Sequence, residues 1–251
     1  MITTSTLIAL SVIIFFASIV RGLTGFGLAL VAVPLIQFFM PVIDTAVFIA
    51  IVNFFFSILY YRRSREVIKK QPLGSMALFT GIGVAVGTLI LKFIYPAYIQ
   101  LTWGILIIFI VLFLAKGMSF NIKSEKSALT LSGIFGGILA GSTGITGPPV
   151  AIILSSIRTP KEKFNAIISL FILFAVTYAL LFYLLTGLIR KETVILALCS
   201  VPALLAGLYT GTRLVEHISQ KWFTNIVYAI LIIMGIITIL KGLKGLFPAL
   251  F

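Results

Sequence analysis

The chain has 251 residues, of which 61% are hydrophobic and 10% charged, and its mean hydropathy is +1.22. A soluble domain carries about 45–50% apolar and about 25% charged residues, so this composition excludes a soluble protein and indicates an integral membrane protein. The net charge of +13 comes from short loops between apolar runs, a pattern typical of cytoplasmic loops. We therefore expect the lipid bilayer, and no nucleic acid, as a partner.

The first half of the chain contains five apolar segments. Their hydrophobic residues are continuous rather than alternating, so we expect helices and not the strands of a β-barrel. The segments cover residues 5–20, 25–40, 44–61, 73–93 and 98–115. The first ends at Arg21-Gly22, the second is closed by Pro41, and a basic loop over 62–72 follows the third.

The second half repeats this arrangement after a polar linker. Its segments cover residues 128–140, 145–157, 164–186, 193–215 and 222–240. Sliding residues 21–32 forward by 119 positions gives five identities. They are Gly22 on Gly141, Thr24 on Thr143, Gly25 on Gly144, Val31 on Val150 and Ala32 on Ala151. The chain therefore resembles two copies of one unit.

A second internal match supports the duplication. At an offset of 124, Gly83-x-x-x-Gly87-Thr88 corresponds to Gly207-x-x-x-Gly211-Thr212. Small residues four apart lie on one helix face and let neighbouring helices approach closely. We predict one transmembrane domain made of an N-terminal repeat, 1–118, a cytoplasmic linker, 119–125, and a C-terminal repeat, 126–251.

Segment length separates spanning helices from shorter pieces. A span takes about 20 residues, whereas 128–140 and 145–157 have 13 residues each. We expect these two to form a re-entrant hairpin, with Pro148 and Pro149 in the first turn of the exiting helix, where a missing N–H costs little. The predicted fold is an all-α membrane protein with two inverted-topology repeats of about five segments, the first two of each forming a broken or re-entrant hairpin.

Basic residues set the expected orientation. Loops 62–72, 116–126 and 158–163 carry clusters of Lys and Arg, and the positive-inside rule makes them cytoplasmic. Counting crossings from these loops inverts one repeat relative to the other and puts both termini outside. We expect a multi-pass protein of the inner or plasma membrane.

The glycine-rich breaks are the candidate functional site. The N-terminus of each half-helix presents unpaired N–H groups and the positive end of the helix dipole, which together suit a small oxyanion. Threonine and serine hydroxyls add donors, and Arg21 adds a positive charge. The predicted substrate-binding residues are Arg21, Gly22, Thr24, Gly25, Gly141, Ser142, Thr143, Gly144 and Thr146, with Gly27, Asn53, Gly147 and Pro148 as secondary candidates.

Two of these residues have competing interpretations. Arg21 either supplies charge to the site or snorkels to a membrane interface. Asn53, in mid-segment, is either a ligand or a helix–helix hydrogen bond, and its repeat mate Ile172 favours the latter.

Catalytic chemistry has little support in the sequence. The acidic residues all fall at segment ends, and there is one cysteine, Cys199, and one histidine, His217. We therefore expect no enzyme activity, no metal site and no cofactor. The coupling ion, proton or sodium, and the oligomeric state, including a homodimer, stay open.

The two breaks resemble a known family. Arg21-Gly-Leu-Thr-Gly-Phe-Gly, followed by an apolar run to Pro34, and Gly141-x-Thr-Gly-x-x-Gly-Pro-Pro are similar to the two signatures of the TauE/SafE family, also described as the toluene sulfonate uptake permease family. The resemblance covers essentially the whole chain. It implies transport of sulfur-containing anions such as sulfite, sulfoacetate and other organosulfonates, by members described both as exporters and as importers.

The leading hypothesis is thus a secondary transporter of small sulfur-containing anions that works by alternating access at a midplane site. The alternatives are a channel-like anion pathway, which the same donors would line, and a transporter of another small organic anion.

Overall fold

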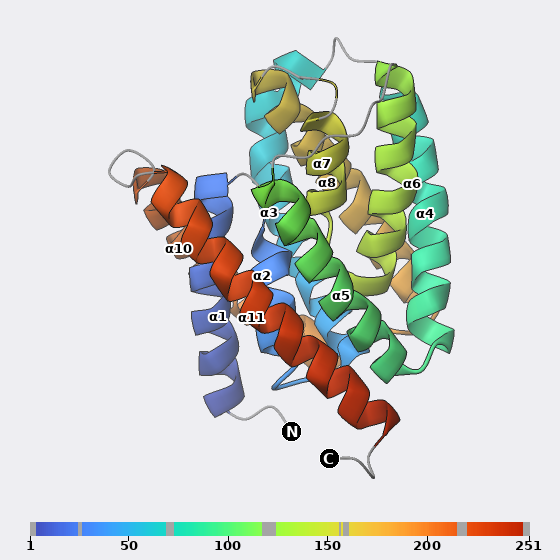
Figure 1. Cartoon of the computed structure of the whole chain (residues 1–251), viewed down its shortest axis with the longest axis vertical. Helices are drawn as coiled ribbons and strands as arrows, with labels where there is room; N and C mark the ends of the chain where they lie inside the picture. The colour runs from blue at the N-terminus through green and yellow to red at the C-terminus, as the bar shows by residue number, and fades with distance from the viewer. Residues whose placement is uncertain are drawn as a thin grey trace.

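A computed structural model describes residues 4–24, 27–68, 73–116, 124–155, 157, 161–214 and 220–247. In these ranges the structure consists of helices, and no strand is present (Figure 1). The helices are α1 (Thr4–Thr24), α2 (Leu28–Ile36), α3 (Val42–Ile68), α4 (Gly74–Phe93), α5 (Pro96–Ala115), α6 (Glu125–Thr143), α7 (Gly147–Ser155), α8 (Lys161–Leu185), α9 (Lys191–Cys199), α10 (Val201–Leu214) and α11 (Gln220–Leu246). The prediction of an all-α fold is confirmed.

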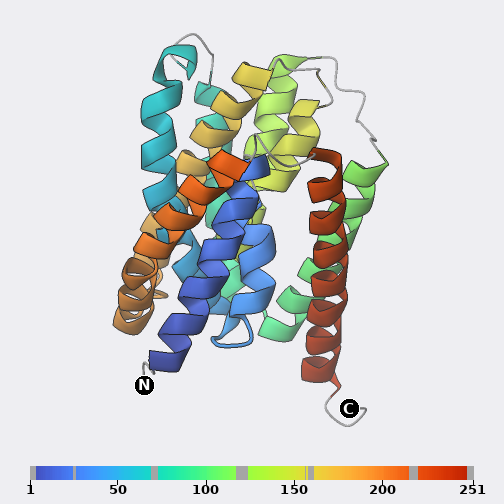
Figure 2. The same ribbon diagram turned by 90° about the vertical axis from the view of Figure 1, so that its left-hand side faces the viewer.

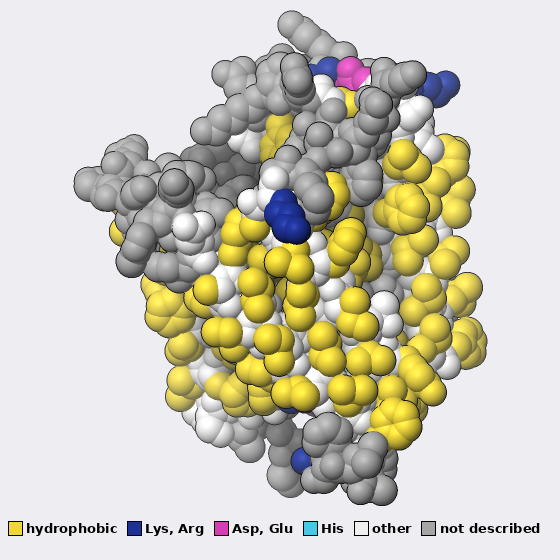
Figure 3. Space-filling view, in the orientation of Figure 1, with side chains coloured by type: hydrophobic (Ala, Val, Ile, Leu, Met, Phe, Trp, Pro, Cys, Tyr) yellow, Lys and Arg dark blue, Asp and Glu magenta, His cyan; other side chains and the backbone are white. Residues whose placement is uncertain are grey.

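Six stretches of the described residues are long and apolar enough to cross a membrane. They lie in α1, α4, α5, α8, the consecutive pair α9–α10, and α11. In Figure 3, hydrophobic side chains cover the middle of one face, while most of the visible charged side chains lie toward its two ends. This distribution is that of a multi-pass membrane protein.

The most extensive helix contacts join the two halves of the chain. Helix α4 packs on α6 and α10 packs on α1, so the fourth segment of each half lies against the first segment of the other. The third segments, α3 and α8, also pack on each other, as do the fifth, α5 and α11, which run side by side in Figure 1. The halves therefore interlock rather than form separate bodies.

Glycines bring the backbones of these pairs together, as the Gly-x-x-x-Gly matches predict. A methyl group built on Gly83 would lie 2.5 Å from the carbonyl oxygen of Ile134 in α6. One built on Gly211 would lie 2.7 Å from the carbonyl oxygen of Ile19 in α1. These separations leave no room for a Cβ atom, so close helix approach at both matches is confirmed.

Substitution of Gly87 tests how much this contact stabilises the fold. The new Cβ of Gly87→Ala would overlap the carbonyl oxygen of Ile138 and lie 2.9 Å from the backbone nitrogen of Ser142. We expect the melting temperature of the purified protein to fall by roughly 5–10 °C, which corresponds to a few kcal/mol in a chain of this size. Gly74→Ala is the matched control, because nothing lies within 4 Å of its Cβ position. Equal melting temperatures for the two variants would contradict the role of the contact.

The α6–α7 hairpin differs from the prediction in the length of its limbs. The expectation of two limbs of 13 residues was wrong, because α6 has 19 residues, about 28 Å, and α7 has nine, about 13 Å. The apolar run begins at Ala128, but the helix begins at Glu125, whose carboxylate forms a 2.7 Å ion pair with Lys163 of α8. A polar first turn thus lengthens α6 beyond its apolar part.

Two other segments also depart from their predicted extents. The segment expected over 25–40 contains only the nine-residue α2, which is followed by a turn over 37–40. The segment expected over 193–215 is interrupted at Ser200, between α9 and α10. Pro202 explains this interruption, since it has no N–H to donate to the carbonyl four residues earlier.

The two hairpins enter the bundle from opposite ends. Figure 1 and Figure 2 show both chain termini at one end, from which α1 rises, while α6 descends from the other end. Short helices α2 and α7 follow them and return toward the ends from which α1 and α6 started.

Candidate anion-binding site

Helix α3 lies between the two breaks. Ala46, Ile49, Asn53 and Phe56 follow each other at spacings of three and four residues, so they share one face of this helix. All four are buried. Residues from both hairpins contact this face, which makes it the centre of the candidate site.

The α6–α7 break contacts this face of α3 at Ile49. Helix α6 ends at Gly144, whose backbone is left-handed, with φ +75°, and whose N–H donates to the carbonyl oxygen of Ala140 at 2.9 Å. A methyl group on Gly144 would lie 3.1 Å from Cγ2 of Ile49. Glycine is therefore required here both for the backbone conformation and for close contact with α3.

Arg21 contacts the same face further along α3, at Asn53 and Phe56. Its side chain is 2% exposed and extends into the bundle rather than to a membrane interface. The guanidinium Nη1 donates a hydrogen bond to Oδ1 of Asn53, and its carbon atom lies 3.5 Å from the centre of the Phe56 ring. Arg21 thus links the end of α1 to the middle of α3 through a hydrogen bond and a cation–π contact.

The two breaks therefore converge on consecutive turns of α3. Ile49, beside Gly144, and Asn53, beside Arg21, are four residues apart, about 6 Å along the helix axis. Asn53 lies about 16 Å along the axis of α3 from its start at Val42.

The hydroxyl groups of the second break are engaged by backbone groups. Ser142 Oγ donates to the carbonyl oxygen of Ile138 at 2.8 Å, and Thr143 Oγ1 donates to that of Leu139 at 2.5 Å. Thr143 Oγ1 also accepts the N–H of Ile145 at 2.9 Å. In this arrangement the two hydroxyls fix the turn and direct their protons to α6 rather than to a ligand.

The first turns of α2 and α7 offer backbone donors instead. Gly27 precedes α2 in a left-handed conformation, with φ 112°, and the N–H groups of the first turn have no acceptor within the helix. Helix α7 begins at Gly147, and its next two residues are prolines without an N–H, as predicted for the exiting helix. Thr146 and Gly147, at this N-terminus, are buried. The α7 end therefore presents fewer donors than the α2 end.

Two predicted site residues have a packing role. A Cβ on Gly22 would lie 3.1 Å from the backbone of Gly211, and one on Gly141 would lie closer still to the backbone of Val84. The carbonyl oxygen of Gly141 also accepts a hydrogen bond from the Tyr183 hydroxyl at 2.8 Å. The side chains of Thr24 and Pro148, and the whole of Gly25, lie outside the described residues.

Asp44, Arg190 and Thr193 form a polar cluster near the end that carries the termini, which the sequence did not predict. Asp44, in the first turn of α3, accepts hydrogen bonds from Arg190 Nη1 at 3.1 Å and from Thr193 Oγ1 at 3.0 Å. A pocket of about 350 Å³ opens beside these residues, lined also by Glu192 and Phe39 among others. Asp44 falls at a segment end, as expected, but nothing in its local sequence indicates a partner 146 residues away.

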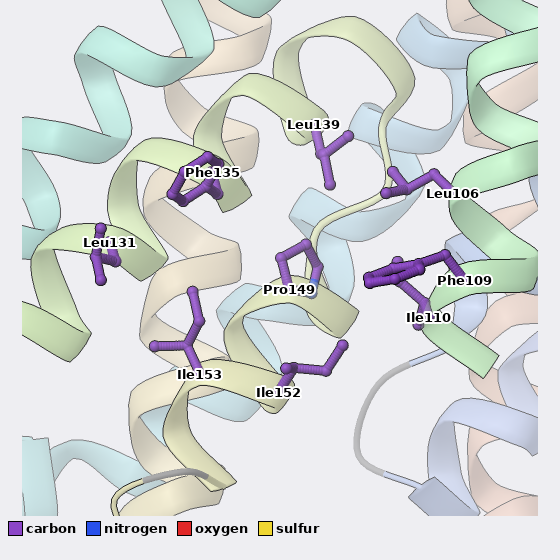
Figure 4. A pocket seen from close by; sticks show the side chains of 9 residues that line it. All are labelled: Leu106, Phe109, Ile110, Leu131, Phe135, Leu139, Pro149, Ile152 and Ile153. Carbon is purple, nitrogen blue, oxygen red and sulfur yellow. The ribbon is translucent and has the colours of Figure 1, made fainter. Parts of the chain in front are cut away.

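A second pocket has a different character. It has a volume of about 430 Å³ and is lined by Leu106, Phe109, Ile110, Leu131, Phe135, Leu139, Pro149, Ile152 and Ile153 (Figure 4). These side chains come from α5, α6 and α7 and are all apolar. The pocket therefore offers no donors for an anion.

Comparisons with known proteins identify the family of the chain. Residues 10–238 match the family model described as "Sulfite exporter TauE/SafE". A curated protein of Cupriavidus necator, named "Probable sulfite/organosulfonate exporter TauE", is 24% identical over 233 residues, which are 90% of this chain and 90% of that protein. No solved structure matches the chain significantly.

Proposed function

The chain belongs to the TauE/SafE family of membrane transporters, and on this basis we propose that it is a secondary transporter of small sulfur-containing anions, such as sulfite or an organosulfonate. Alternating access at the α3 site moves the anion across the membrane. The name of the Cupriavidus necator relative supports both the substrate class and export as the direction.

The convergence of both breaks on α3 is the observation that carries this proposal. A guanidinium buried near the middle of the bundle is costly unless it serves a function, and an anion is its natural partner. Helix α2 packs on α3, α7 begins three residues after Gly144, and the N-terminal turn of each helix carries positive potential. Broken helices meeting at the midplane are typical of secondary transporters.

The two halves form inverted repeats in this proposal. Supporting this, α1 and α6 run in opposite directions, and each is followed by a nine-residue helix. The exchanged packing of α4 on α6 and of α10 on α1 is the pattern that a two-fold axis in the membrane plane produces.

A difference between the repeats supports alternating access. Helix α11 holds the end of α2, because Lys241 Nζ donates to the carbonyl oxygen of Gln37 at 3.3 Å and lies 3.2 Å from the centre of the Phe38 ring. In the other repeat, the apolar pocket separates α5 from parts of α6 and α7. Two equivalent hairpins packed differently are what an exchange between two conformations requires.

Transport by the purified protein in liposomes tests the proposed function. We expect saturable uptake of ³⁵S-labelled sulfite or sulfoacetate that is accelerated by the same unlabelled anion on the other side of the membrane. Uptake that does not saturate and shows no such acceleration would support a channel. Preference for a cation would contradict the site, because two helix N-termini and Arg21 repel positive charge.

Cysteine labelling tests the orientation. In a Cys199→Ser background, Ser124→Cys at the start of α6 should be protected from an impermeant thiol reagent added to intact cells. Lys191→Cys at the start of α9 should react, because both positions are exposed and the basic loops place them on opposite sides. Labelling of Ser124→Cys from outside would reverse the proposed topology.

A further inference from the structure

We propose that the side-chain amide of Asn53 donates a hydrogen bond directly from Nδ2 to the transported anion and thus forms part of the substrate site. This inference rests on the proposed function and assigns a second donor to the same site. It resolves the two interpretations of Asn53 by giving each end of the amide a different partner.

Among the described residues, the Asn53 amide has a hydrogen-bond partner only at its oxygen. Asn53 is 0% exposed, and its Oδ1 accepts the hydrogen bond from Arg21 Nη1. Because a guanidinium can only donate, this bond fixes the orientation of the amide and points Nδ2 away from Arg21. Nδ2 has no hydrogen-bond partner among the described residues. A buried amide N–H without an acceptor is destabilising, so Nδ2 calls for a partner beyond the described residues, and a bound ligand would supply one.

The position of Asn53 identifies the kind of partner. The residue lies one turn from Ile49, which touches Gly144, and one turn from Phe56, which covers the Arg21 guanidinium. Its N–H therefore lies between the contacts of α3 with the two hairpins, on the residue that binds the positively charged Arg21 guanidinium. A ligand here must accept hydrogen bonds and carry negative charge, which describes the oxygens of a sulfite or sulfonate group.

The repeat mate of Asn53 is apolar. The repeat offset of 119 places Asn53 on Ile172 of α8, which is buried. The amide donor is thus present on one of the two central helices only, so the site is asymmetric even though the repeats are related. The anion is accordingly held against α3 rather than midway between α3 and α8.

A double-mutant cycle separates direct contact from positioning of Arg21. The proteins are wild type, Asn53→Leu, Arg21→Met and the double variant, and the measurement is sulfoacetate affinity. If Asn53 binds the anion, Asn53→Leu weakens binding roughly tenfold or more, both in the wild-type background and in the Arg21→Met background. If Asn53 only holds Arg21, Asn53→Leu has no effect once Arg21 is replaced, and the inference is wrong. The double variant removes both partners of the buried pair, which favours a stable fold.

A second measurement does not depend on Arg21 variants. In the Cys199→Ser background, Asn53→Cys is buried in this conformation, so it should react with iodoacetamide when alternating access opens the site, and saturating sulfoacetate should slow this reaction at least severalfold. Ser124→Cys, which is exposed and distant, serves as the control whose reaction rate sulfoacetate leaves unchanged. A rate at position 53 that sulfoacetate does not change would overturn the direct contact. Failure of the wild-type protein to transport any sulfur-containing anion would instead refute the proposed function.

Discussion

Arg21→Met is expected to reduce sulfite or sulfoacetate transport by at least 100-fold. The substitution keeps an unbranched apolar side chain in the buried space but removes the charge that faces the site. Loss of a charged hydrogen-bonding group from a bound anion costs about 1.5–3 kcal/mol, and loss of its charge in a poorly solvated site adds to this. Because about 1.4 kcal/mol is a factor of ten, the combined effect exceeds two orders of magnitude.

Two further variants help to explain the expected loss of transport in Arg21→Met. Arg21→Lys keeps the charge but loses the planar fork and the stacked contact with Phe56, so we expect intermediate transport. Arg213→Met removes an exposed arginine at the end of α10 and should leave transport unchanged. Uptake rates in liposomes, at matched amounts of monodisperse protein, provide the measurement. A wild-type uptake rate for Arg21→Met would show that the guanidinium serves only to join α1 to α3.

Gly144→Ala is expected to reduce transport at least tenfold, and Gly144→Leu to abolish it. An L-residue with φ near +75° is strained by about 1–2 kcal/mol, and the added Cβ also presses on Ile49 at 3.1 Å. Both effects displace the turn from α3, where the two breaks meet. A small displacement of groups around a bound anion is enough to weaken every hydrogen bond to it.

Substitution of Gly187 is a control for the free-energy cost of the left-handed backbone alone. Its φ of +72° is nearly the same, but nothing lies within 4 Å of its Cβ position. Gly187→Ala should therefore lower stability by a similar backbone cost and leave transport close to that of wild type. Adding Ile49→Ala to Gly144→Ala should restore part of the activity by relieving the contact. Equal losses for Gly144→Ala and Gly187→Ala would show that strain alone, and not contact with α3, explains the effect.

Composition and internal repetition determined much of this fold in advance. The continuous apolar runs predict membrane helices, because backbone groups in hydrocarbon must be paired within a segment. The two Gly-x-x-x-Gly matches identified the faces along which α4 packs on α6 and α10 packs on α1. The glycine-rich motifs located the second break correctly at Gly144, since a left-handed residue ending a helix is most often glycine.

Helix lengths were less predictable. Apolarity marks the part of a helix that lies in lipid, whereas hydrogen bonding decides where the helix begins and ends. Helix α6 therefore extends through Glu125, which pairs with Lys163 of another helix, and the α9–α10 segment breaks at Ser200, ahead of Pro202. The proline is visible in the sequence, but its effect within a long apolar run depends on how neighbouring helices pack.

The roles of individual polar residues were decided by tertiary structure alone. The sequence presents Ser142 and Thr143 as donors in a glycine-rich turn, yet both hydroxyls bond to their own helix, as such side chains readily do. It leaves Arg21 between two roles and favours packing for Asn53. Only the folded chain brings these two residues, 32 positions apart, into contact beside both breaks, because long-range packing onto α3 sets that distance and local propensity does not.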